Sequence, residues 1–141
     1  MDFFFIHCVN SSIFFSKLVR FPALDLQTRL RLLEWKGRVD LLMYVSRGCP
    51  KLLREEITKY PVKHDWPALF DRATSHPQDD GHLSKFIRAV AHGENVCKSF
   101  EGQGPHAMPV SGKMWLQIGN MGKLDRVTPL QNWQDFLFRH G

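Results

Sequence analysis

The sequence predicts a mainly α-helical fold, bundle-like in arrangement, with a short irregular or extended segment near residues 105–122. Two observations support this prediction. Residues that favour helix ends recur along the chain, and apolar residues follow them at the three- and four-residue spacing of a helix face. Between Glu101 and Gly122 glycine and proline break this pattern, and MPVSGKMWLQIGNMG is compatible with a short extended segment or a hairpin.

The first predicted helix lies in the phenylalanine-rich start, MDFFFIHCVNSSIFF. A signal peptide carries basic residues before its apolar run, whereas here Asp2 precedes the run and Lys17 and Arg20 follow it. The run is also too short and too polar to span a bilayer. We expect a buried helix and no membrane span, with a signal or anchor as the alternative. Because no capping residue precedes Asp2, we also expect a longer protein whose start is missing, and self-association through the exposed N-terminal helix.

The principal helix is predicted from Asp25 to Arg47. Asp25 is a capping residue, and Gly48 followed by Pro50 ends the helix. Pro50 then suits the first turn of a short helix that stops at Pro61.

Three more helices are predicted further along the chain. Asp65 with Pro67 begins one that Pro77 closes, and PLQNWQDFLFRHG near the C-terminus has the pattern of a short amphipathic helix. DDGHLSKFIRAVAHGENVCKSF should bury one face, because its apolar residues recur at helical spacing. These residues are Leu83, Phe86, Ile87, Val90 and Ala91.

Composition indicates an ordinary globular protein, with 43% apolar and 23% charged residues. The net charge of +5 is mildly basic, but the basic residues alternate with acidic ones, which favours a solvated surface over a nucleic-acid footprint. Three cysteines without CxxC spacing indicate reduced thiols in an intracellular protein, which we expect to be cytoplasmic. The sequence has no repeat, P-loop, GxGxxG or GxSxG motif.

Seven histidines are present, but none forms an HExxH motif or another pair with ligand spacing, so a metal site would combine distant segments. His7 stands out because phenylalanines and isoleucines surround it in sequence. A neutral imidazole in apolar surroundings can act as a metal ligand or a base. The alternative is a core histidine with satisfied hydrogen bonds.

Lys36 lies among apolar residues near the middle of the principal helix. One interpretation is a lysine that extends its amine to the surface and pairs with Asp40, one turn further on. The other is that burial disfavours the ammonium form and leaves a nucleophilic amine, which can act as a base, form a Schiff base, or take up CO2 as a carbamate. Gly37 would let another backbone, a cofactor or a substrate approach at this point.

Four segments, in the same order, resemble the C-terminal part of the questin oxidase-like family, which occurs mainly in fungi. They are FFFIHCVNSSIFFSKL, LLEWKGRVDLLMYVSRGCPKLL, DDGHLSKFIRAVAHGENVCKSFEG and GKMWLQIGNM, and the likeness covers residues 2–121. The resemblance implies a much longer, largely helical oxidoreductase. Its members include oxidases of polyketide pathways that open anthraquinone rings, described as Baeyer–Villiger-type or ring-cleaving oxygenases.

The resemblance also implies a metal site. Some members are thought to hold a mononuclear non-haem iron through several histidines and a carboxylated lysine, and NADPH is a possible source of reducing equivalents. The lysine corresponds to Lys36 in EWKGR and one histidine to His7 in FIHCVN, while His82 in DDGHLSK is a further candidate, as ligand or substrate contact. The other histidines would lie upstream, so this chain alone is expected to be inactive.

The expected organisation is one partial domain over residues 1–141, with a tail at residues 122–141 that departs from the family pattern. Lys113 also stands where an acidic residue is expected. The predicted function is that of a C-terminal fragment of an oxidase acting on aromatic polyketides. Two alternatives stay open: a non-catalytic helical remnant or interaction module, and a small membrane-associated protein anchored by its phenylalanine-rich start.

Overall fold

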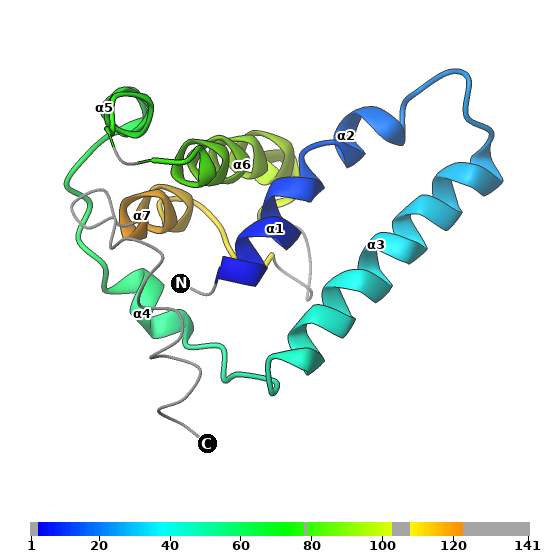
Figure 1. Ribbon diagram of the computed structural model, residues 1–141, viewed down its shortest axis with the longest axis horizontal. Coiled ribbons are helices and arrows are strands. Elements are labelled where there is room, and N and C mark those ends of the chain that lie inside the picture. The colour runs from blue at the N-terminus through cyan, green and yellow to red at the C-terminus, as the bar shows by residue number, and fades with distance from the viewer. Residues whose placement is uncertain (1–2, 78, 103–107, 123–141) are drawn as a thin grey trace.

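The computed structural model describes residues 3–77, 79–102 and 108–122. More than half of them are helical and none forms a strand, which confirms the predicted mainly α fold (Figure 1). The α-helices are α1 (Phe3–Ser12), α2 (Phe15–Leu18), α3 (Leu26–Ser46), α4 (Arg54–Thr58), α5 (Trp66–Thr74), α6 (His82–Cys97) and α7 (Met114–Met121). A 3-10 turn, Lys98–Phe100, extends α6.

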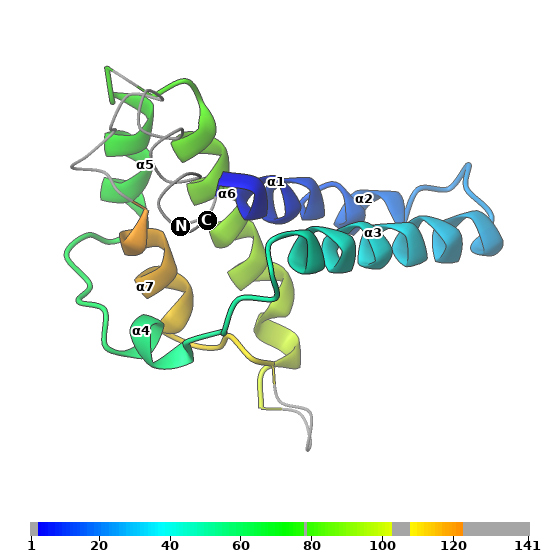
Figure 2. The ribbon, with the colours of Figure 1, turned by 60° about the horizontal axis from the view of Figure 1, so that its bottom comes forward.

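Helices α1, α2 and α3 form an arm, in which α1 and α2 run outward and α3 returns beside them (Figure 2). At the outer turn the Arg29 guanidinium and Nε donate to three backbone carbonyl oxygens at 2.8–3.2 Å. At the inner end the rings of Phe5 and Tyr44 pack with centroids 6.5 Å apart. The arm is thus closed by local contacts at both ends.

The bounds of α3 follow from the residues that were predicted to cap it. The Asp25 carboxylate accepts a hydrogen bond from Thr28 N at 2.7 Å, and the chain leaves the helix through Gly48, whose φ is +77°. A positive φ costs glycine little, which explains why the helix ends there. The prediction of a helix from Asp25 to Arg47 is confirmed.

The buried core lies between α5 and α6, with α7 beside them. Its fully packed residues are Leu69, Ala73, Phe86, Ile87 and Val90. Those from α6 belong to the face that was predicted to be buried. Ile6 packs against the same core, so α1 lies between the core and α3 (Figure 1). At the start of α5 the Asp65 side chain accepts from Ala68 N at 3.0 Å, as predicted for its cap.

Helix α7 corrects one expectation, because residues 114–121 are helical and not extended. Gly119 interrupts the apolar pattern in sequence, but here it allows close packing: a Cβ would lie 2.9 Å from Trp66 Cζ3 and 3.0 Å from Leu69 Cδ1. Buried Asn120 also fixes the helix, because its Oδ1 accepts from Lys63 N and His64 N at 3.0 and 2.9 Å. Of the described residues in the predicted range, 108–113 and Gly122 are irregular.

Two other expectations differ from the structure. The short helix begins at Arg54, not at Pro50, whose carbonyl oxygen accepts a hydrogen bond from the Tyr44 hydroxyl at 2.9 Å instead. The first helix is present but half-exposed, with Phe4 43% exposed, because the described residues cover only part of its surface. The predicted helix in PLQNWQDFLFRHG and most of the divergent tail lie outside the described residues. No helix in the described ranges has the length and apolar character needed to span a membrane.

Candidate metal-binding site

Two of the predicted site residues meet where α1 crosses the start of α6. The imidazole rings of His7 and His82 have centroids 5.4 Å apart and stand nearly perpendicular, at 89°. These residues are far apart in sequence, so the tertiary fold brings them together. The pair is a nitrogen-rich group at the boundary between the arm and the core.

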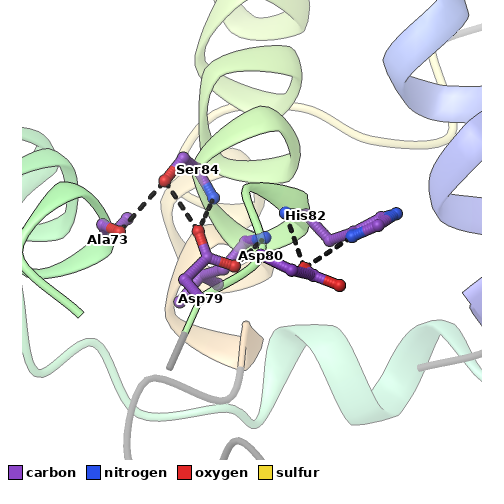
Figure 3. A network of polar contacts seen from close by, with 6 residues as sticks. Ala73, Asp79, Asp80, His82 and Ser84 are labelled. Carbon is purple, nitrogen blue, oxygen red and sulfur yellow. Dashed lines mark hydrogen bonds and ion pairs between the residues drawn. The ribbon is translucent and has the colours of Figure 1, made fainter. Parts of the chain in front are cut away.

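Asp80 orients the second imidazole. Its Oδ1 lies 2.6 Å from His82 Nδ1 and also accepts a hydrogen bond from His82 N at 3.2 Å (Figure 3). The hydrogen bond from the His82 side chain holds the pKa of the Asp80 carboxyl below its usual range. With the Nδ1 proton directed to the carboxylate, the lone pair of the neutral ring is on Nε2, which is the usual arrangement of a metal-binding histidine and its supporting carboxylate.

Asp79 fixes the backbone that carries this pair. Its carboxylate accepts from Leu83 N at 3.0 Å and Ser84 N at 3.2 Å, and lies 2.8 Å from the Ser84 hydroxyl (Figure 3). The same hydroxyl lies 3.0 Å from the carbonyl oxygen of Ala73, which connects α5 to α6. Burial opposes ionisation of Asp79, but these hydrogen bonds prevail and keep the pKa of its carboxyl below the ordinary value.

Lys36 lies in the contact between α3 and α1. Its side chain is 15% exposed, its Nζ donates to the carbonyl oxygen of Cys8 at 3.0 Å, and it forms an ion pair with Asp40. The predicted pairing with Asp40 is therefore confirmed. Burial, followed by the neighbouring Asp40 carboxylate, raises the pKa of the Cys8 thiol. The thiol is accordingly a weak nucleophile and a weak metal ligand in this arrangement.

Two of the three predicted metal ligands thus contact each other, and the third contacts a residue next to one of them in sequence. His7 and His82 face each other, whereas Lys36 reaches the backbone of the residue that follows His7. His7 is exposed, contrary to the expectation of burial, since the described elements leave its side of α1 uncovered. No three histidine, cysteine or acidic side chains of the described ranges lie close enough to hold a metal together.

Neither Asp80 nor Cys8 was predicted from the sequence to belong to the site. Asp80 precedes His82 by two residues in DDGH, and a carboxylate that close to a candidate ligand was a usable signal. Cys8 carried no such signal, because its role depends on a carbonyl oxygen and on Asp40 from another helix.

Comparison with known proteins identifies the family. Residues 1–90 match the model of the questin oxidase-like family. A Baeyer-Villiger oxidase of Pestalotiopsis microspora is 44% identical over 86% of this chain and 27% of its own length. The questin oxidase of Aspergillus fumigatus is 40% identical over 86% of this chain and 28% of its own. For the oxidoreductase AflY of Aspergillus parasiticus the values are 38%, 94% and 27%.

The curated relatives are much longer than this chain, which spans 27–28% of the length of the three named above. The family model, however, covers well over half of the 141 residues, including α1, α3 and the start of α6. The match therefore includes the positions of His7, Lys36 and His82. This chain belongs to the questin oxidase-like family.

Proposed function

We propose that the chain is part of an oxidoreductase that uses O2 to oxidise and open aromatic polyketides, such as anthraquinones, in fungal secondary metabolism. The family match supports this proposal, as do relatives named questin oxidase and Baeyer-Villiger oxidase. Because the chain spans only part of those relatives, the activity is proposed for the complete protein. We expect the 141 residues alone to bind metal weakly and to be inactive.

The observation that carries the proposal is the imidazole pair of His7 and His82 with its supporting carboxylate, Asp80. Imidazole nitrogen is a ligand that iron accepts, and a carboxylate on the opposite nitrogen fixes the ring and raises its basicity. These two residues would supply two nitrogen ligands to a non-haem iron in the complete protein. Further ligands would come from outside the described ranges, since these contain no group of three.

Bound iron would supply the redox chemistry with O2, and NADPH is the proposed source of reducing equivalents. The residues of this chain have more limited tasks. Asp80 holds a proton at His82 Nδ1 and keeps Nε2 available, while Asp79 fixes the turn from which both residues project. Asp79 and Asp80 are therefore positioning residues.

The two interpretations of Lys36 require different chemical forms of its amine and different contacts with Asp40. A carbamate forms only on the neutral amine, and it would put a second negative charge beside Asp40. In the structure the amine pairs with Asp40 and connects α3 to α1 through the Cys8 carbonyl oxygen. A ligand role for Lys36 therefore requires that Asp40 first give up its contact with the amine.

Cobalt(II) titration tests the imidazole pair directly, because its visible absorption reports nitrogen coordination. We expect weak binding by the 141-residue chain, a loss of at least about tenfold in affinity for His7→Ala and for His82→Ala, and a smaller loss for Asp80→Asn. His64→Ala is the control, because His64 contacts Asn120 through its backbone N–H and carbonyl groups. Equal spectra for wild type and the His7 and His82 variants would reject the pair as a metal site.

Iron analysis of a complete chimera decides the role of Lys36. In the chimera this segment replaces the matching part of the Pestalotiopsis relative. Lys36→Arg keeps the positive charge and can still pair with Asp40, but it cannot form a carbamate. If the lysine is a ligand, the variant loses iron and activity while its folding persists. Normal iron content in the variant would leave Lys36 as a structural ion-pair residue.

A further inference from the structure

Helix α3 is the longest helix in the described part of the chain, yet none of its residues is buried. Its contact with α1 and with the turn after α2 uses one narrow stripe, which includes Arg29, Lys36 and Asp40. On either side of this stripe, residues three and four apart form two rows of large apolar side chains. The leucine row consists of Leu26, Leu30, Leu33 and Leu41, which are 44–65% exposed. The second row consists of Trp35, Val39 and Leu42.

The two rows differ in what covers them. In the second row, the Arg38 guanidinium lies 5.8 Å from the centroid of the Trp35 ring, so a neighbour on the same helix shields it in part. The leucine row instead contains Gly37, which lies on the same face between Leu33 and Leu41. A Cβ built at Gly37 has no atom within 4 Å. The described residues therefore leave Gly37 uncovered and the four leucines of the row 44–65% exposed.

Two other glycines inside α-helices of the described structure lie where a second helix packs closely. At Gly93, a Cβ would lie 2.7 Å from Trp115 Cζ3, and at Gly119 it would lie 2.9 Å from Trp66 Cζ3. Both glycines thus occur where another helix packs closely on the backbone. Gly37 is a third glycine inside an α-helix and destabilises an exposed helix relative to alanine. Its expected packing partner is not among the described residues.

We propose that the leucine row is a docking surface for a helix from the part of the questin oxidase-like protein outside these 141 residues, and that this helix crosses α3 at Gly37. Spacings of three and four residues are those that accept the side chains of another helix at a shallow angle. The relatives supply enough chain, because this segment covers only 27–33% of those named Baeyer-Villiger oxidase in Pestalotiopsis microspora and Emericella nidulans. The inference depends on family membership and not on the proposed activity.

If the proposal is right, substitutions at Gly37 shift the Tm in opposite directions in the isolated chain and in the complete chimera. In the 141-residue chain, Gly37→Ala and Gly37→Leu add a better helix former in open space, so the Tm should rise by about 2–4 °C. In the complete chimera, Gly37→Leu would separate the packed helices, and the Tm should fall by about 5 °C or more. Gln27→Ala, on the polar side of α3, is the control and should change neither Tm by more than about 1 °C.

Differential scanning fluorimetry of the wild types and variants in both contexts measures these shifts, and no activity is required. A rise in both contexts would overturn the proposal, because nothing would then pack at Gly37. As a second measurement, Gly37→Ala in the complete chimera should lower the Tm less than Gly37→Leu does, because its side chain is smaller.

Two other occupants are distinguished by the isolated chain. If light scattering shows a dimer that Gly37→Leu abolishes, the leucine row binds a second copy and the proposal fails. Sedimentation with vesicles of neutral or anionic phospholipid tests a lipid surface in the same way. Binding that Leu30→Asp abolishes would assign the row to the membrane instead.

Discussion

The α5–α7 core and the α1–α3 arm use the same local signals but differ in what their side chains contact. Asp65 and Asp25 cap their helices alike, each accepting a backbone N–H from three residues ahead, at 3.0 and 2.7 Å. Helix α5 then buries Leu69 completely, whereas α3 buries nothing. The comparison shows that capping fixes where a helix begins regardless of whether its apolar face has a partner.

Polar contacts differ between the two regions in the same way. In the core, the buried side-chain amide of Asn120 joins α7 to the loop before α5 by accepting hydrogen bonds from two backbone N–H groups. In the arm, Lys36 joins α3 to α1 through an ion pair with Asp40, whose side chain is 41% exposed, and a hydrogen bond to one carbonyl oxygen. Because the Asp40 carboxylate reaches solvent, water screens this pair and reduces what it adds to the stability of the fold. The core should therefore determine the stability of the isolated chain, and the arm should contribute little.

Shortening one leucine in each region gives the largest expected contrast. Leu69→Ala removes a fully buried side chain from the core and should lower the free energy of unfolding by about 2–5 kcal/mol. Leu42→Ala shortens a side chain that is 68% exposed in the arm and should change it by less than about 0.5 kcal/mol. Urea denaturation followed by circular dichroism measures both.

Similar losses of stability in the two leucine variants would contradict the inferred difference between the core and the arm. Leu42 would then have a partner in solution, and the arm would be covered by self-association. Repeating the denaturation at several protein concentrations detects this, because the midpoint of an associating chain rises with concentration.

Much of the helical architecture could be predicted from the sequence, because caps and periodicity are local signals. Asp25 and Asp65 fixed two helix starts, and the spacing of Phe86, Ile87 and Val90 indicated the buried face of α6. Helix α7 could not be recognised, because Gly119 resembles a breaker in sequence and its reason, the approach of Trp66, is a tertiary contact.

The candidate site was harder to predict because its geometry is entirely non-local. Family resemblance selected His7, His82 and Lys36, but their sequence positions did not reveal that the two imidazoles would meet and Lys36 would turn to Cys8. The expected burial of His7 was wrong for a related reason. Apolar neighbours in sequence indicate that a surface needs cover, and they do not say which segment covers it.

Removing the amide of Asn120 should have an intermediate effect on stability. It tests whether polar contacts in the core contribute more than those in the arm. Asn120→Ala leaves the N–H groups of Lys63 and His64 without their acceptor inside the fold, so stability should fall by about 2 kcal/mol. Gln27→Ala removes an exposed amide from the arm and should have almost no effect. Equal losses in urea denaturation would mean that the loop before α5 finds water as a substitute acceptor.

The smallest expected effect concerns the acidic residues at the helix starts, and it depends on pH. The pKa of Asp79 lies below its ordinary value in the folded chain because hydrogen bonds to the carboxylate outweigh burial, and the pKa of Asp25 is lowered by the backbone hydrogen bond from Thr28. A lowered pKa means that the folded chain binds the proton more weakly than the unfolded chain, so each carboxylate stabilises the fold above the unfolded pKa of 3.8. That contribution disappears as the pH falls through the folded pKa.

Asp79→Asn should therefore lower stability by about 1 kcal/mol at neutral pH, and the difference from wild type should shrink as the pH falls below 3.8. Asp25→Asn should act in the same direction but less strongly, because Asp25 is exposed at the end of the arm. Urea denaturation of wild type and both variants between about pH 2.5 and 7 measures the convergence. A difference for Asp79→Asn that stayed constant down to the lowest pH would mean that the side chain caps α6 through geometry alone, and that its charge contributes nothing to the contrast between core and arm.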